Sequence, residues 1–189
     1  SQTYPFRTYS IQDGLSESVV NAILQDNDGY LWFATGYGLN RFDGENFESF
    51  FEESGLSHSK VLSLYQARDG KIWIGTAQGV NVLVDDSIYT PKSLIGLNSS
   101  EIISIHEDIE GHMWFGTDGD GVWHNVSQDQ VVLYSTSQGL LSNQVRSIAE
   151  TKDGDIWFAN YVYSNYDSYD FESDEWVNDE WNQGYLLRE

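Results

Sequence analysis

The chain has 189 residues, of which 40% are hydrophobic, and its 30 acidic and 9 basic residues give a net charge of −21. This length suits one ordinary domain, and the apolar content excludes a disordered chain. The negative charge argues against partners that carry phosphate, namely nucleic acid and anionic membrane surfaces, while the absence of cysteine excludes disulfides and zinc–thiolate sites.

From the N-terminus, an extended segment at Tyr4–Ser10 precedes an alternation of short apolar runs and turns. The Gly14-Leu15 pair opens a unit in which an Asp28-Gly29 turn follows the first apolar run. Asp-Gly between apolar runs is a strong hairpin signal, because both residues tolerate positive φ. The strands of this first unit are predicted at Val19–Gln25, around Trp32, at Gly38–Phe42 and at Asn46–Phe51.

The same unit returns three more times. Trp32, Trp73, Trp114 and Trp157 follow one another at intervals of 41, 41 and 43 residues, and the Gly-Leu pairs that begin at Gly14, Gly55, Gly96 and Gly139 keep the same three intervals. Two markers in phase identify a tandem repeat of about 40 residues. Four short strands per repeat, without a sustained 3.6-residue period, predict an all-β fold. We expect a β-propeller built of four four-stranded blades, as a partial ring or half of an oligomeric ring, with the tryptophans between neighbouring blades.

The repeat divides the chain into six consecutive segments. The last copy departs from the pattern, because its second turn has no glycine, although Asn165–Ser173 echoes Arg41–Ser49 of the first copy. The predicted segments are 1–13 as the outer strand of a preceding blade, 14–54, 55–95, 96–138 and 139–183 as blades one to four, and 184–189 as the start of a truncated fifth repeat.

The motif of these copies resembles the two-component regulator propeller repeat. The tryptophan is followed by Phe or Ile rather than Asp, which separates the pattern from WD repeats. The resemblance extends from Gly14 to about Trp176. In the first copy it is carried by Gly14, Leu15, Ser16, Asp28, Gly29, Trp32, Phe33, Thr35 and Gly38.

The resemblance implies an extracytoplasmic sensory domain of a bacterial signal-transduction protein. Such a domain is not itself an enzyme and senses a small molecule such as an oligosaccharide. Family members usually place their propellers in the periplasm, ahead of a transmembrane helix and a cytoplasmic histidine kinase or diguanylate cyclase. We therefore expect a periplasmic location in a membrane-anchored parent, of which this chain would be the N-terminal piece.

Strand order predicts which loops share a face. If the first apolar run of each unit is the innermost strand, the Gly-Leu loops and the loops after the tryptophan strands lie on one face, where propellers commonly bind ligands. Polar and aromatic groups there suit a sugar or another neutral ligand, although each residue also fits a solvated turn. The loop residues predicted to bind ligand are Glu17, Tyr37, His58, Gln78, Asp118, Asp120, Asn143, Tyr161 and Tyr163.

Two further ligand-binding candidates, His106 and Arg146, interrupt the apolar trend of the first strands. An arginine that is buried or faces the channel needs an anionic partner, so Arg146 either pairs with a local carboxylate or contacts ligand. The acidic loop Thr117–Gly121 lacks the spacing of the helix–loop–helix calcium motif. We therefore predict no metal site, no cofactor and no catalytic residue.

Two other functions remain open from the residues alone. The same face could bind a protein, as an interaction scaffold, or the chain could be a glycoside-cleaving enzyme on a propeller scaffold. Its four histidines suggest no nucleophile–base arrangement, and its carboxylates are too numerous for a glycosidase pair to be chosen by spacing.

An isolated arc of four blades would expose an apolar face at each end. We therefore expect the chain to self-associate, either as a homodimer in which two arcs complete a ring of eight blades or in another form.

Overall fold

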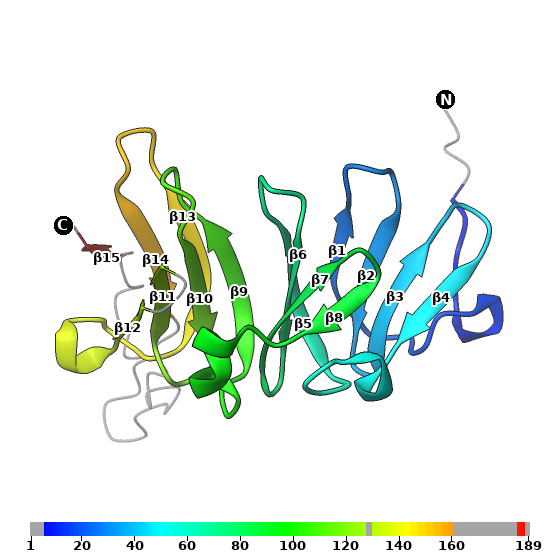
Figure 1. Cartoon of the computed structure of the whole chain (residues 1–189), viewed down its shortest axis with the longest axis horizontal. Helices are drawn as coiled ribbons and strands as arrows, with labels where there is room; N and C mark the ends of the chain where they lie inside the picture. Colours follow the sequence, from blue (N-terminus) through cyan, green and yellow to red (C-terminus); the bar gives the residue numbers. More distant parts are fainter. Residues whose placement is uncertain (1–5, 128–129, 161–184, 188–189) are drawn as a thin grey trace, which may run out of the picture.

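The computed structural model describes residues 6–127, 130–160 and 185–187, which form four antiparallel sheets standing side by side (Figure 1). Three sheets have four strands and the last has three. The sheets consist of β1 (Val20–Gln25), β2 (Leu31–Thr35), β3 (Gly38–Phe42) and β4 (Phe47–Phe50); β5 (Val61–Gln66), β6 (Ile72–Thr76), β7 (Gly79–Val84) and β8 (Ser87–Tyr89); β9 (Ile102–Glu107), β10 (Met113–Thr117), β11 (Val122–Ser127) and β12 (Gln130–Tyr134); and β13 (Val145–Glu150), β14 (Ile156–Asn160) and β15 (Tyr185–Leu187).

The all-β prediction is confirmed. The helices of the described residues are short 3₁₀ segments: η1 (Ile11–Asp13), η2 (Glu52–Ser54), η3 (Lys92–Leu97) and η4 (Thr136–Gln138). Three of them end at the glycine of a Gly-Leu pair, as η1 does at Gly14, whose φ of 109° lies in the left-handed region that favours glycine. None of the described helices has the length and apolar character needed to cross a membrane.

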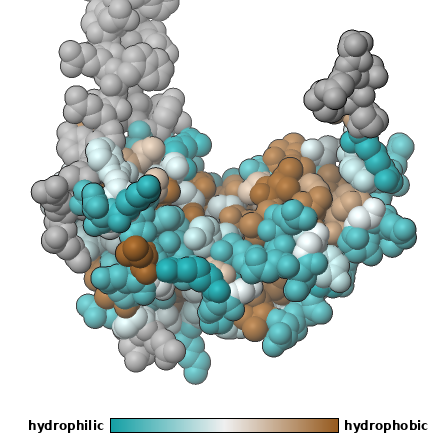
Figure 2. Space-filling view, turned by 90° about the horizontal axis from the view of Figure 1, so that it is seen from above, coloured by the Kyte–Doolittle hydropathy of each residue, from teal (hydrophilic) through white to brown (hydrophobic). Residues whose placement is uncertain are grey.

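The first strand of each sheet is the innermost strand, as the sequence predicts. Strands β1, β5, β9 and β13 contact one another in that order, and within each sheet the later strands follow outward. Seen from above, the molecule is a crescent that is hollowed on one side (Figure 2). Each copy of the repeat therefore stands as one radial sheet of a curved array, as in a β-propeller.

The hydrophobic core lies between the sheets, in three clusters. Trp32 is 2% exposed and packs with Ile74 of the next sheet, while Trp114 is 6% exposed and packs with Phe158. The middle cluster is centred on the fully buried Phe115, against which the partly buried Trp73 packs. Trp157 of the last sheet is 42% exposed. The predicted place of the tryptophans between neighbouring sheets is confirmed for the first three copies.

Two rows of hydrogen bonds join neighbouring sheets. On the inner strands, a polar side chain donates to the first carbonyl of the next inner strand: Asn21 to Val61, Ser63 to Ile102 and Ser104 to Val145, at 2.7, 2.8 and 3.1 Å. At the Asp-Gly hairpins, a backbone N–H donates to the last side chain of the next inner strand: Asn27 to Gln66, Arg68 to Glu107 and Ile109 to Glu150, at 3.0, 2.8 and 3.1 Å.

The described parts of the two chain ends differ from the simple repeat pattern. Residues 6–10 form no strand, although an outer strand of a preceding blade was expected within 1–13. Ser10 instead caps η1, and Tyr9 packs its ring on Phe42 and Phe47. Tyr185–Leu187, which was expected at the start of a fifth repeat, pairs with β14 as part of the fourth sheet. The expected outer hairpin at 165–173 lies outside the described residues.

Candidate functional site

The loops that were predicted to share a face form a row of hydrogen-bonded pairs. The glycine after each tryptophan strand donates its N–H to the Gly-Leu loop of the next copy: Gly38 to Ser59, Gly79 to Ser100 and Gly121 to Asn143, at 2.6, 2.9 and 2.8 Å. These bonds form a third row between sheets, on the face opposite the Asp-Gly hairpins. The predicted assignment of both sets of loops to one face is confirmed.

In the first three copies, a buried threonine fixes the loop after the tryptophan strand. The Thr35 hydroxyl donates to the Gly38 carbonyl at 2.8 Å and accepts from the Tyr37 N–H at 3.1 Å. Thr76 and Thr117 make the corresponding bonds in the next two copies. These hydrogen bonds hold the loop backbone in place. The position of the Cα atom from which each exposed side chain extends is therefore fixed as well.

The first loop junction brings Tyr37 and His58 to the same edge of the face. Tyr37 is 59% exposed, and its ring lies 5.4 Å from that of Phe51. His58 accepts the Lys60 N–H at its Nδ1 atom, at 2.9 Å. The carboxylate of Glu17 lies close to Gly36, next to Tyr37. At the second junction, Gln78 is exposed.

The third loop junction brings three of the predicted residues together. Asp118, which is exposed, accepts a hydrogen bond from the Gln144 amide. Asp120 accepts from the Ser100 hydroxyl at 2.7 Å. The Asn143 side-chain oxygen accepts the Thr136 N–H at 2.8 Å. The Asn143 backbone carbonyl accepts the N–H groups of Gly119 and Gly121. Asn143 therefore holds the backbone of this junction in place, while Asp118 is exposed to solvent.

Two of the remaining predicted residues, His106 and Arg146, lie on the inner strands β9 and β13. His106 stands near the hairpin end of β9, where its Nε2 lies 3.7 Å from Glu150 Oε2 and its ring lies 6.3 Å from that of Tyr65. Arg146 is exposed near the loop end of β13, so it lies beside the loop face. Tyr161 and Tyr163 lie outside the described residues.

Sequence reasoning missed a polar groove on the hairpin face, between the first two copies. It has a volume of about 660 Å³, and its lining includes Asp26, Tyr30, Arg41, Lys71 and Asp86. Arg41 binds Glu48 at 2.6 Å and Asp86 at 2.5 Å and lies 5.0 Å from the centre of the Tyr30 ring. Partial burial works against the charge, but the two carboxylates raise the pKa of Arg41. The groove thus holds its arginine in internal ion pairs.

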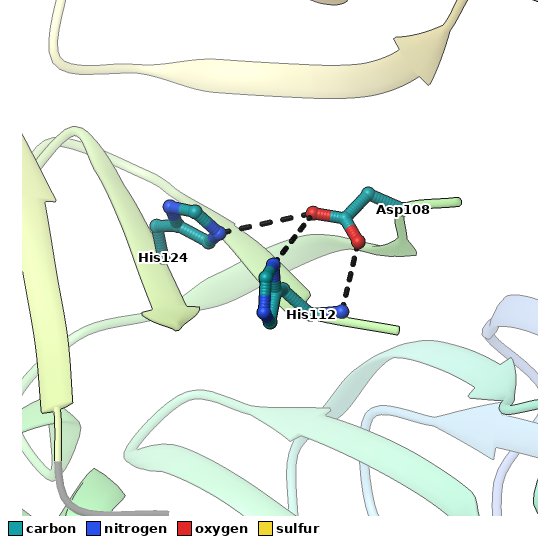
Figure 3. Close-up of side chains that lie close together, drawn as sticks. All are labelled: Asp108, His112 and His124. Atoms are coloured by element: carbon teal, nitrogen blue, oxygen red, sulfur yellow. Dashed lines mark hydrogen bonds and ion pairs between the residues drawn. The ribbon is translucent and has the colours of Figure 1, made fainter. Parts of the chain in front are cut away.

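Sequence reasoning also missed a cluster of Asp108, His112 and His124 on the same hairpin face (Figure 3). The Asp108 Oδ2 atom lies 3.5 Å from His112 Nδ1 and 3.8 Å from His124 Nε2. Burial alone would raise the pKa of Asp108, but hydrogen bonds from the Trp114 indole and the His112 N–H outweigh it and lower the pKa. Comparison of equivalent positions among the four copies would have pointed to the cluster.

Comparison with known proteins gives a match at every copy. A family model described as two component regulator propeller matches residues 14–37, 55–78, 96–119 and 139–162, which together make up just over half of the chain. A histidine kinase of Formosa agariphila is 44% identical over 48 residues, which are 25% of this chain and 4% of that protein.

Solved structures give the same architecture. The extracellular domain of a hybrid two component system from B. thetaiotaomicron has a TM-score of 0.69 and is 27% identical, over 79% of this chain and 20% of that one. Virginiamycin B lyase from Staphylococcus aureus has a TM-score of 0.59 at 15% identity, over 78% of this chain and 50% of that one, which is a likeness of fold alone. The matched part of the chain spans only 4% of the histidine kinase and 20% of the hybrid two component system domain.

Proposed function

Because the chain belongs to the two component regulator propeller family, we propose that it is an extracytoplasmic sensory domain whose loop face binds a small neutral ligand such as an oligosaccharide. It is homologous to extracellular sensory propeller domains of hybrid two-component systems. A periplasmic location, in a membrane-anchored parent with a histidine kinase or diguanylate cyclase as output, extends the same proposal.

The row of paired loops is the observation that carries the binding proposal. Each loop has a backbone fixed by a buried threonine and by a hydrogen bond to the next copy, whereas the exposed side chain changes from Tyr37 to Gln78 to Asp118. A constant frame with a varied polar and aromatic surface suits recognition, because rigid strands hold the contacting groups in place. A neutral ligand also avoids the repulsion that a charge of −21 would impose on an anion.

The domain itself is proposed to be non-enzymatic. The likeness to a lyase is one of fold, and a fold does not carry an activity with it. A protein-interaction scaffold remains the alternative function, because the same loops could meet a protein surface. The ligand experiment below separates the two, since a scaffold would bind no glycan.

Binding is tested by thermal melting of the chain against a panel of neutral oligosaccharides. A ligand of the folded state stabilises by RT ln(1 + [L]/Kd), or about 2.7 kcal/mol at a hundred times Kd, so one panel member should raise Tm. Tyr37→Ala is expected to weaken that binding about tenfold, equivalent to about 1.4 kcal/mol. Tyr89→Ala is the matched control, because Tyr89 is similarly exposed, at 47%, but lies on the outer strand β8. A panel without any shift, or equal losses in both variants, would reject the proposed site.

We further propose that the two ends of the array bind the end blades of another copy of the chain. Ile23 of the first inner strand is 62% exposed and Val19 before it is 59% exposed, while Trp157 of the last sheet is 42% exposed. In Figure 2, hydrophobic residues gather toward the N-terminal end of the crescent. Pairing of two arcs into one ring, which makes a homodimer, would cover both ends.

Light scattering of the 189-residue chain at micromolar concentration tests this association. We expect a mass of twice 21.5 kDa or a larger assembly. Ile23→Glu should return the protein to a monomer, because it places a charge in the apolar contact, whereas Ile109→Glu, at a residue that is equally exposed, at 64%, on a hairpin turn, should not. A monomer at every concentration would contradict self-association.

A further inference from the structure

Three positions on the hairpin face of the third copy hold a combination of side chains that the other copies lack. Six residues before each tryptophan stand Asp26, Ala67, Asp108 and Thr151, and two residues before it stand Tyr30, Lys71, His112 and Asp155. Opposite the tryptophan on the third strand stand Arg41, Val82 and His124. Among these sets, the third copy alone combines a carboxylate with two imidazoles.

From this combination we propose that Asp108, His112 and His124 bind a divalent transition-metal ion of the zinc type. Two imidazole nitrogens and a carboxylate oxygen are ligands that such an ion favours. The three ligand atoms lie within 4.8 Å of one another. Bonds of about 2.0–2.1 Å at a tetrahedral angle place neighbouring ligand atoms about 3.3 Å apart, so the 3.5 and 3.8 Å separations from Asp108 Oδ2 require only small movements.

The surroundings of the cluster orient its ligands. Asp108 Oδ1 accepts the N–H groups of Glu110 and His112 at 3.0 and 2.8 Å, and its Oδ2 accepts the Trp114 indole N–H at 2.8 Å. The His124 ring stacks on Trp114, with the ring centres 3.6 Å apart. Partners of this kind fix the direction of metal ligands, and their loss usually weakens metal binding.

The fold does not require the two histidines. In the first copy Asp26 accepts the Trp32 indole N–H at 2.7 Å and two backbone N–H groups, which is the same turn. That copy stacks Arg41 over its tryptophan and has Tyr30 at the position of His112. The Asp–Trp bond is therefore a structural part of the repeat, and the imidazoles are an addition to it.

The ion has a route to the cluster from solvent. The His112 side chain is 28% exposed, whereas those of Asp108 and His124 are 9% and 6% exposed. Glu110, whose side chain is 74% exposed, places its Oε2 atom 3.5 Å from His112 Nδ1. His112 and Glu110 thus stand at the opening, and the remaining ligand positions would be taken by water or by Glu110.

Isothermal titration of the untagged chain with Zn²⁺, in excess Ca²⁺ to occupy surface carboxylates, tests the site. We expect one Zn²⁺ per chain and no displacement by Ca²⁺, which favours oxygen ligands. His112→Tyr should weaken Zn²⁺ binding at least tenfold while the apo protein keeps its Tm, because tyrosine occupies this position in the first copy. His58→Ala, which removes a histidine from the opposite face, should leave the affinity unchanged.

A second measurement uses Co²⁺ in place of Zn²⁺. A cobalt ion held by His112 and His124 should give visible absorption bands that His124→Gln removes. Absence of saturable Zn²⁺ binding in the parent chain, or equal affinity in His112→Tyr and the parent, would overturn the proposal.

Discussion

Replacement of Phe115 with alanine is expected to lower the free energy of unfolding by about 3–5 kcal/mol. The Phe115 side chain is fully buried and lies in the cluster between the second and third blades, with Val80 and Ile102. Its ring centre lies 5.4 Å from that of Trp73. Removing it leaves a cavity at a contact between two sheets, where neither backbone can collapse without leaving its own hydrogen-bonded ladder.

Urea unfolding followed by circular dichroism measures this loss. Tyr89→Ala serves as the control, because Tyr89 is an aromatic residue that is 47% exposed on an outer strand, and its loss should cost less than about 1 kcal/mol. Equal effects of the two substitutions would show that the inter-blade clusters do not dominate stability.

Gly116→Ala is expected to destabilise the protein by about 2–3 kcal/mol through overpacking. A Cβ atom at Gly116 would overlap the Ser104 hydroxyl and lie 2.7 Å from the Val145 carbonyl oxygen of the next inner strand. Ser104 donates to that same carbonyl. The substitution therefore pushes the third and fourth blades apart and disturbs the bond that joins them.

Thermal melting measures the effect, with Gly96→Ala as the control. A Cβ atom at Gly96 meets nothing within 4 Å, and its φ lies outside the left-handed region, so alanine there should be neutral. The first copy suggests a compensating variant, because Ala34 stands opposite Ala22 where the third copy has Gly116 opposite Ser104. Adding Ser104→Ala to Gly116→Ala should therefore recover part of the loss. A Gly116→Ala protein as stable as the parent would contradict the packing argument.

The repeat made most of the fold predictable. The tryptophans and the Gly-Leu pairs recur in phase. They predicted the order of strands and turns in each copy and the shared loop face, because every copy uses the same turns and the same inward residues. The chain ends were not predictable in this way. Tyr4–Ser10 has an extended pattern, yet a strand forms only where another strand accepts its hydrogen bonds, and Tyr9 packs its ring on Phe42 and Phe47 of the first sheet.

Candidate sites were less predictable than the fold. The loop residues follow from topology, so Tyr37 and Asp118 could be named from sequence. The Asp108–His112–His124 cluster was missed, because Asp108 and His112 lie on the turn between β9 and β10 whereas His124 lies on β11, and the register of His124 beside Trp114 brings it to them. The prediction of His106 as a ligand-binding residue considered which strand it occupies but not how far along that strand it stands.

The three rows of bonds between neighbouring blades give the array a polarity. In every row the donor belongs to one blade and the acceptor to the blade that follows it: Asn21 to Val61, Asn27 to Gln66 and Gly38 to Ser59 at the first junction alone. The first blade therefore presents the acceptor side of this pattern and the last blade presents the donor side. Two copies can extend the pattern only head to tail, with the fourth blade of one against the first blade of the other, because two like ends would set acceptor against acceptor or donor against donor.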